Sequence, residues 1–442
     1  MKNLYSKTIA LVAVFMTLFA TSCEDILGEG INENPNSPTA VPVTVLLPAA
    51  EVFIVDATGG DFSRFTSVLT QQVEGVARQW VSINNYSNMI PATLNTTWNN
   101  MYENILVELI EIKTTSADNG FGTYEGVADV LLAYSLMLSA DMWDNIPYTE
   151  AFQGVGNISP VFDSQASIYT EVNNLLTEGI TLLTAGSDGG FPVGGEDVIY
   201  GGDLSLWIKA ANGLLARMHL HQGNYAAALT AAGNSFDSPA DNMAYTYPDA
   251  TNSAQWFRFN RDRTGDIEFH GTMSAIMTGL NDTDRLAMFN PTFVTDHPYL
   301  IATYEQELIS YRELKFIEAE CLFRTDGSTA AVRDAYLAGI EASFAEVGVS
   351  DGYAAYVAQA SVDPGVGNVT LDQIITQKYI GLFTHPEVYN DWRRTNIPAL
   401  TPTTGANVPV RLPYGSDEHL FNANAPTEES VNIFTDRVGW NR

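Results

Sequence analysis

Apolar residues recur every three or four positions along several stretches of the chain, which is the period of an amphipathic helix. The first stripe consists of Phe62, Phe65, Leu69, Val73, Val76 and Trp80. It predicts a helix from 62 to 80, in which Trp80 is first of all a core residue. Between 82 and 97 the stripe gives way to an asparagine-rich stretch, so the sequence predicts a loop there and a new helix from about Trp98.

Two stretches further along have the pattern of helical hairpins. In the first, from 203 to 232, Asp203 can cap a helix, and Gly223 precedes a second helix that begins near Tyr225. Glycine permits the tight turn, and the aromatic ring fills the space between the helices. The second hairpin is expected from 304 to 344. The aromatic-rich stretch between the hairpins is predicted to be irregular, and loops of that length are commonly functional.

The first residues have the pattern of a secretory signal. Lys2 and Lys7 precede an almost unbroken apolar run from 9 to 20, and small residues lead up to Cys23. The run is shorter than the roughly 20 residues that span a bilayer. We expect cleavage before Cys23, with 1–22 removed. The same cut in an ordinary secreted protein would leave Cys23 as a free thiol.

Charge narrows the range of partners. The chain carries 52 acidic and 21 basic residues, a formal net charge of −31. Nucleic-acid affinity comes chiefly from Lys and Arg that neutralise phosphates, so nucleic acid is excluded as a partner. The hydrophobic share of 45% predicts a large packed core. Cys321 is the only cysteine besides Cys23, so no disulfide framework is expected.

Motifs for catalysis are missing from the sequence, so we predict no enzyme, no cofactor and no metal site. A surface glycoside hydrolase remains an alternative, because that chemistry needs only two carboxyl groups about 5 to 10 Å apart. A structural or adhesion protein is a third interpretation. Arg393 and Arg394 suit either an anionic ligand or structural forks to carboxylates, and the acid-rich composition favours the forks.

Neutral sugars are bound by flat aromatic faces together with amide and carboxylate groups. Aromatic residues beside such groups in polar stretches are therefore the ligand-binding candidates, and burial in the core is the competing interpretation for each ring. The candidates are Trp80, Asn84, Tyr86, Trp256 and Arg258.

Several segments, in this order, resemble the SusD/RagB family of outer-membrane nutrient-binding lipoproteins, closest to its shorter branch. They are the start at Cys23, DMWDNIPYTEAF from Asp141, WIKAANGLLARMHL from Trp207, NDTDRLAMF from Asn281, ELKFIEAECLFR from Glu313, AYLAGIEASF from Ala335, DWRRTNIP from Asp391 and RLPYGSDEHLFN from Arg411. The chain departs from the family at Asp282-Thr283-Asp284-Arg285, where Asp-Pro-Arg is common, and is only loosely similar from 424 to 442.

The resemblance implies a mainly α-helical fold, in which about four tetratricopeptide-like helix pairs support loop-rich segments. It implies a lipidated N-terminus and extended tether over 23–48 and a nutrient-binding domain over 49–442. The start resembles a lipobox, with Ala20 where Leu is usual, and Glu24-Asp25 resembles an export signal. We therefore expect a lipid on Cys23, exposure on the outer-membrane surface, and delivery of an oligomeric nutrient, a glycan, to a SusC-like TonB-dependent transporter.

Overall fold

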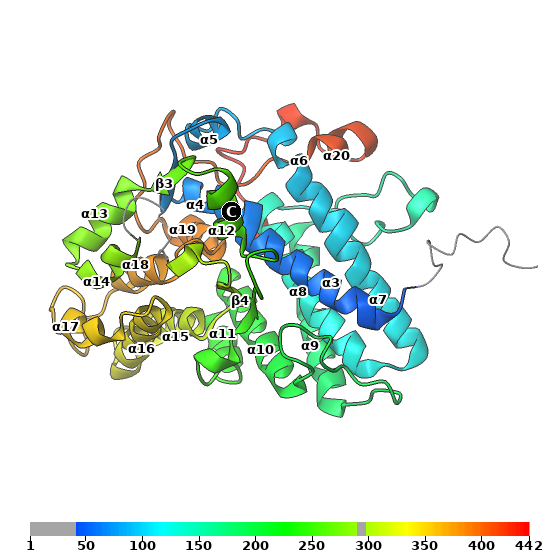
Figure 1. Ribbon diagram of the computed structural model, residues 1–442, viewed down its shortest axis with the longest axis horizontal. Coiled ribbons are helices and arrows are strands. Elements are labelled where there is room, and N and C mark those ends of the chain that lie inside the picture. Colours follow the sequence, from blue (N-terminus) through cyan, green and yellow to red (C-terminus); the bar gives the residue numbers. More distant parts are fainter. Residues whose placement is uncertain (1–40, 290–297, 442) are drawn as a thin grey trace, which may run out of the picture. The chain divides into compact units, whose positions relative to one another are not determined.

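Helices make up most of the chain, as Figure 1 shows. The structure is a computed structural model that describes residues 41–289 and 298–441. The signal sequence and the lipid acceptor Cys23 lie outside the described residues. The expectation of a mainly α-helical fold is confirmed, because the strands form only two short two-stranded sheets among the described residues.

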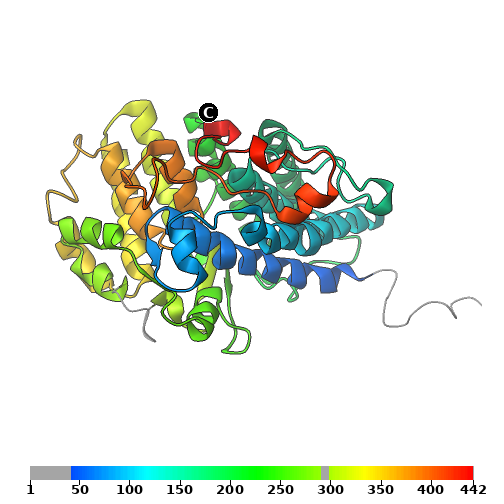
Figure 2. The same cartoon turned by 90° about the horizontal axis from the view of Figure 1, so that it is seen from above.

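A succession of helices, each packed on the next, runs through the middle of the chain. Its members are α7 (Val107–Asn119), α8 (Gly122–Trp143), α9 (Gln165–Ala185), α10 (Leu204–His221), α11 (Tyr225–Ala232), α15 (Tyr311–Asp326), α16 (Ala330–Glu346) and α18 (Leu371–Gly381). In both views the cyan-to-green helices lie side by side and lead to the yellow ones (Figures 1 and 2). This nearest-neighbour packing is what helical repeats produce.

Helix α8 is the centre of the core. It is long and apolar enough to cross a membrane by composition, but its 18-residue apolar window is 100% buried inside the protein, as befits a core helix. Glycines allow α9 to approach it closely: a Cβ atom at Gly126 would lie 2.8 Å from the Leu183 side chain, and one at Gly179 would lie 3.1 Å from the Gly126 carbonyl oxygen.

The first predicted hairpin forms as α10 and α11. The Asp203 carboxylate accepts hydrogen bonds from the backbone N–H groups of Ser205 and Leu206, which caps α10. Gly223 adopts a positive φ of 73° in the turn. The Tyr225 ring is half-buried and lies beneath the Arg324 guanidinium, 5.4 Å from its ring centroid. The hairpin prediction is confirmed, although its aromatic ring is less buried than expected.

Two predictions for the N-terminal part are wrong. Helix α3 (Val43–Ala57) begins inside the predicted tether, so residues 43–48 are helical despite Pro48. The predicted helix from 62 to 80 ends with α4 (Ser63–Leu69), because the chain then turns through Gln71 at a φ of 58° into strand β1 (Val73–Gly75). The apolar spacing continues beyond α4 because Val73 of the strand and Trp80 are also buried, although Val76 between them is exposed.

The predicted loop from 82 to 97 contains helical residues at both ends. Helix α5 (Gln79–Asn84) precedes it, and α6 (Pro91–Asn100) begins at Pro91, a residue favoured in the first turn of a helix. Two π-helical turns interrupt the helices nearby. They are η1 (Thr58–Phe62), between α3 and α4, and η2 (Met101–Leu106), between α6 and α7.

The stretch expected to be irregular holds short elements instead. They are β2 (Met243–Thr246), α12 (Gln255–Asp262), β3 (Ile267–Phe269), α13 (Gly271–Gly279) and α14 (Thr283–Phe289). Strand β3 pairs antiparallel with β1, and β2 pairs antiparallel with β4 (Glu305–Ile309), which occupies the expected start of the second hairpin. After α18 follow α19 (Glu387–Thr395), α20 (Ser416–Phe421) and two 3-10 turns, η7 (Glu428–Ser430) and η8 (Gly439–Asn441).

Candidate functional site

Two of the predicted sugar-stacking rings are in the core. Trp80 is 4% exposed and Trp256 is 2% exposed. Both contact Phe259, with ring centroids 5.4 and 6.2 Å apart, and the Trp256 indole N–H donates a 2.8 Å hydrogen bond to Ser63 Oγ. The structure thus brings the two predicted segments together, but around a buried aromatic cluster. The prediction that a ligand stacks on Trp80 or Trp256 is therefore corrected, because neighbouring side chains cover both rings.

The other three candidates lie nearer the surface. Arg258 is partly exposed and lies 4.0 Å from the Asp56 carboxylate. Asn84 is half-buried at the end of α5. Tyr86 has a buried ring, yet it lines a surface hollow and its hydroxyl accepts a hydrogen bond from the Thr403 backbone N–H. Tyr86 therefore remains a candidate contact.

Helix α6 contributes Pro91 to one hollow, Thr97 and Asn100 to a second, and Trp98 and Asn99 to a third; we call them the Tyr86, Arg64 and Trp98 hollows and together the α6 surface. The Tyr86 hollow, about 380 Å³, is lined by Tyr86, Met89, Ile90, Pro91, Pro413, Tyr414, His419, Glu428, Glu429, Val431, Asn432, Ile433 and Phe434. The Arg64 hollow, about 200 Å³, is lined by Phe53, Asp56, Ala57, Gly60, Asp61, Arg64, Thr97, Asn100, Ile105 and Gln255. The Trp98 hollow, about 390 Å³, is lined by Trp98, Asn99, Tyr102, Glu103, Pro147, Ala151, Phe152, Pro160, Asp417, Glu418 and Phe421.

The Trp98 hollow contains a row of stacked rings. The Trp98 and Tyr102 rings lie 4.8 Å apart at 28°, and the Tyr102 and Phe152 rings lie 6.0 Å apart at 13°. Trp98 is the buried end of this row, whereas Tyr102 and Phe152 are half-buried. Phe421, at the end of α20, is 74% exposed beside them. Tyr102 is stacked between its two neighbours, so Phe152, at the outer end of the row, and Phe421 are the rings that can offer a face to a sugar.

Carboxylates and amides border the same row. Asn95 and Asn99 of α6 donate to Asp417 Oδ2 at 2.7 and 2.9 Å, which fixes α20 against α6. These two amides lower the pKa of Asp417 and so keep it ionised. Burial raises the pKa of Glu418, although the Asn422 amide donates to it at 2.6 Å. The hollow therefore offers oriented acceptors for hydroxyl or amino groups.

The Arg64 hollow is smaller and more polar. Both π-helical turns contribute to it, Gly60 and Asp61 from η1 and Ile105 from η2. Asp61 accepts from Arg64 at 2.7 Å and from Thr97 at 3.2 Å. Its volume suits a single sugar unit rather than a longer ligand.

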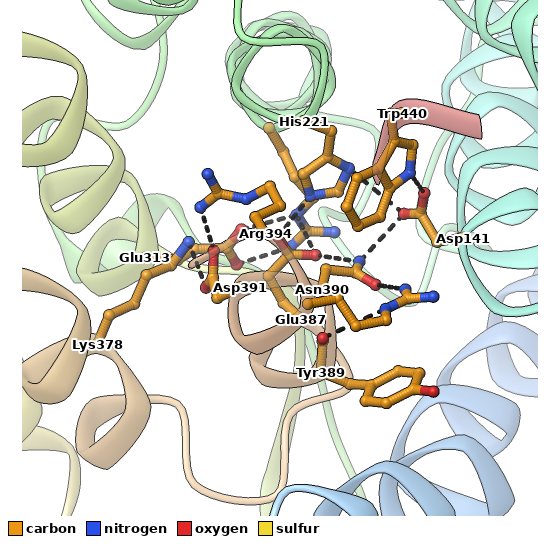
Figure 3. A network of polar contacts seen from close by, with 12 residues as sticks. Asp141, His221, Glu313, Lys378, Glu387, Tyr389, Asn390, Asp391, Arg394 and Trp440 are labelled. Atoms are coloured by element: carbon orange, nitrogen blue, oxygen red, sulfur yellow. Dashed lines mark hydrogen bonds and ion pairs between the residues drawn. The ribbon is translucent and has the colours of Figure 1, made fainter. Parts of the chain in front are cut away.

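A network of buried charged and polar side chains, several of them from α19, occupies the core (Figure 3). Asp141, His221 and Glu387 each place one ligand atom within 4.8 Å of the others, as a metal site would require. The carboxylates, however, approach opposite nitrogens of the imidazole: Glu387 Oε1 is 2.7 Å from Nε2, and Asp141 Oδ2 is 3.5 Å from Nδ1. One ion binds only one nitrogen of a histidine, so this geometry fits hydrogen bonds better than shared metal ligation.

The neighbouring arginines have structural partners. Arg394 forms two hydrogen bonds with the Glu320 carboxylate, so the prediction of a structural fork is confirmed for this residue. Arg393 differs, because it donates to the carbonyl oxygens of Tyr389 and Val410 and lies over the Trp440 ring, 5.1 Å from its centroid. Neither arginine is open to an anionic ligand.

Sequence reasoning missed Tyr102, Phe152, Glu418 and Phe421. The signal that points to the last three is the pair of family-like segments DMWDNIPYTEAF and RLPYGSDEHLFN, which lie more than 250 residues apart and meet at the Trp98 hollow. Apolar periodicity could not reveal this meeting, because it is a tertiary contact between two loop-rich segments.

Comparison with known proteins establishes the family. The SusD-like family described as "Starch-binding associating with outer membrane" matches residues 35–300 and 295–415. No curated protein sequence matches the chain. A SusD/RagB family protein from Bacteroides thetaiotaomicron is 21% identical, with a TM-score of 0.73 over 91% of this chain and 99% of that one.

Two other solved structures show the same fold. A SusD homolog from Bacteroides uniformis is 22% identical, with a TM-score of 0.71 over 90% of this chain and 99% of that one. A chitin-binding SusD homolog from Flavobacterium johnsoniae is 20% identical, with a TM-score of 0.70 over 90% and 97%. With the family match over most of its length, this chain belongs to the SusD-like family of proteins that associate with the outer membrane.

Proposed function

We propose that this protein binds an oligomeric glycan on the α6 surface and passes it, uncleaved, to a SusC-like TonB-dependent outer-membrane transporter. The observation that carries the proposal is the Trp98 hollow, in which half-buried Tyr102 and Phe152 and exposed Phe421 stand beside Asp417 and Glu418. Flat rings bind sugar faces, and the carboxylates accept hydrogen bonds from sugar hydroxyls.

The arrangement of the three hollows favours an oligomer over a single sugar. The Tyr86 and Trp98 hollows share the segment 413–421, since Tyr414 and His419 line the first and Asp417, Glu418 and Phe421 line the second. A chain of several sugar units can therefore contact more than one hollow. Each added contact increases the affinity without new chemistry in any one of them.

The attachment to the membrane and the partner are part of the proposal. A lipid on Cys23 would tether the protein at the cell surface, where a large glycan is accessible. Family membership supports an outer-membrane location. Delivery to a SusC-like transporter is proposed by analogy within the family, and co-purification of the two proteins from detergent-solubilised outer membranes would test it.

Two rival functions make different predictions. A glycoside hydrolase would shorten its ligand, and within the Trp98 hollow Glu418, whose pKa is raised by burial, is the candidate general acid. A structural or adhesion protein would bind no soluble oligosaccharide. We propose to titrate defined glycan oligomers calorimetrically into the purified protein and to analyse each ligand by chromatography after overnight incubation. Saturable binding with an intact ligand is expected. Shortened products would support the hydrolase, and no binding to any glycan would favour the structural role.

A further inference from the structure

The three hollows of the α6 surface are lined by many carboxylates and few cations. The carboxylates are Asp56, Asp61, Glu103, Asp417, Glu418, Glu428 and Glu429. Among the described lining residues the one lysine or arginine is Arg64, which already pairs with Asp61 at 2.7 Å. Seven acids against one base is a larger excess than the 52 against 21 of the whole chain. The acidity of the site therefore exceeds what composition alone gives.

Neutral donors, rather than cations, hold several of these carboxylates. Asp417 accepts from two asparagine amides and Glu418 accepts from the Asn422 amide, whereas Asp56 accepts from the Tyr247 hydroxyl at 2.6 Å and also lies 4.0 Å from Arg258. An amide or a hydroxyl orients a carboxylate without cancelling its charge. The negative charge is thus fixed in place and left available to a ligand.

Carboxylates of the core, in contrast, are paired with basic side chains. Glu313 pairs with Arg217 at 2.6 Å, Asp391 with Lys378 at 2.7 Å and Glu320 with Arg394 at 2.8 Å. Basic residues are scarce in this chain, and the side chains of Arg217, Lys378 and Arg394 are almost wholly covered beside these acids. The α6 surface is left acidic beside a row of aromatic rings, a combination that attracts cations by charge and through the ring faces.

Building on the proposed function, we infer that the α6 surface prefers glycans that carry free, protonated amino groups, such as oligomers of glucosamine. Each ammonium group can donate to an Asp417 or Glu418 oxygen while the sugar face covers Phe152 or Phe421. Neutral oligomers of the same length would bind through the rings and through hydroxyl hydrogen bonds, without the attraction between opposite charges. Uronate or sulfated glycans would be repelled, because the described part of the site holds no unpaired arginine or lysine for them.

The test compares three oligomers of equal length by calorimetry: glucosamine, N-acetylglucosamine and galacturonate. Measurements are made near pH 6 at low and high salt. We expect glucosamine oligomers to bind roughly fivefold to tenfold more tightly than N-acetylated ones at low salt, since each exposed ion pair contributes modestly. The difference should shrink at high salt, which screens exposed charges. Galacturonate oligomers should not bind measurably.

Variants assign the effect to the site. Asp417→Asn with Glu418→Gln should abolish most of the preference while N-acetylglucosamine binding persists. If the double variant fails to fold, Glu103→Gln replaces it in the test. This variant removes an exposed charge of the hollow and should reduce the preference. Glu341→Gln, which removes an exposed charge on α16, is the matched control and should keep the wild-type preference.

The outcomes separate the two proposals. Equal affinity for the amino and N-acetylated oligomers at both salt concentrations would overturn the preference but leave glycan binding intact. Tighter binding of galacturonate would overturn it as well. Failure of all three oligomers and of neutral glucans to bind would contradict the proposed function itself.

Discussion

Arg394 and Glu320 form a doubly hydrogen-bonded ion pair in the core, with Nη1 to Oε1 at 2.9 Å and Nη2 to Oε2 at 2.8 Å. The pair joins α19 to α15 and so connects two of the segments by which the family is identified, DWRRTNIP and ELKFIEAECLFR. The glutamate is fully buried and the arginine nearly so. In these two segments, Arg394 and Glu320 therefore have a structural role.

The ion pair makes stability depend on pH. Although burial alone would raise it, Arg394 lowers the pKa of Glu320 to about 2, from an unfolded value of 4.5. Because the folded pKa is the lower one, the stabilisation is present above about pH 4.5 and is lost as the pH falls toward 2. It amounts to about 3 kcal/mol at neutral pH. Denaturant unfolding of wild type and Glu320→Gln at several pH values checks this. The variant should lose stability at pH 7 and show a flatter acid limb, whereas two parallel pH curves would contradict the assignment.

Trp440 should hold the C-terminal segment in place. Its indole N–H donates to Asp141 at 2.7 Å and its ring stacks on His221 with centroids 5.1 Å apart. Trp440→Phe retains a ring but removes one of the two donors to Asp141 Oδ1, the other being the Tyr169 hydroxyl, and we expect it to lower the free energy of unfolding by about 1 kcal/mol. Urea unfolding measures this. An unchanged midpoint would show that the contact contributes nothing to stability.

Gly223 is required for the turn between α10 and α11. Its φ of 73° is unfavourable for residues with a Cβ atom, so Gly223→Ala should cost about 1 kcal/mol. Tyr225→Ala should cost less than the roughly 3 to 5 kcal/mol of a fully buried ring, since this one is only half-buried. Thermal unfolding of the two variants distinguishes these effects. Gly279→Ala on α13 is the control, because an added Cβ atom there would contact nothing within 4 Å. Wild-type stability of Gly223→Ala would argue against the turn geometry.

Cys23 should carry the lipid. In cells supplied with labelled palmitate, the wild type should take up label and fractionate with the outer membrane. Cys23→Ser should do neither, because the thiol is the proposed acceptor. Retention of the serine variant in the membrane fraction would refute the tether.

The amphipathic helices could be predicted from the sequence because each has one buried face, whereas α8 is buried on all sides. The α10–α11 hairpin is the clearest case, with Asp203 as its cap and Gly223 in its turn. The predicted helix from 62 to 80 failed for the same physical reason. Val73 of the strand and Trp80, which are also buried, prolong an apolar pattern which periodicity alone assigns to a helix.

The binding residues were harder to predict because an aromatic ring in a polar stretch is equally suited to the core. Trp256 illustrates this: its neighbours are polar in sequence, yet its ring packs on Phe259 and its N–H finds Ser63. Phe152 and Phe421 gave no local signal, since their hollow forms only when segments far apart in sequence meet. Tertiary contact, and not local composition, decides which rings face solvent.

The central claim is that the rings of the Trp98 hollow bind glycan. Calorimetric titration of wild type, Phe152→Ala and Phe421→Ala with the best-bound oligomer tests it most directly, with Phe191→Ala as an aromatic control outside the α6 surface. We expect each of the first two variants to lose about 1 to 3 kcal/mol of binding free energy, with Phe421→Ala retaining the wild-type melting temperature, while Phe191→Ala binds as the wild type does. Unchanged affinity in both Phe152→Ala and Phe421→Ala would contradict the account.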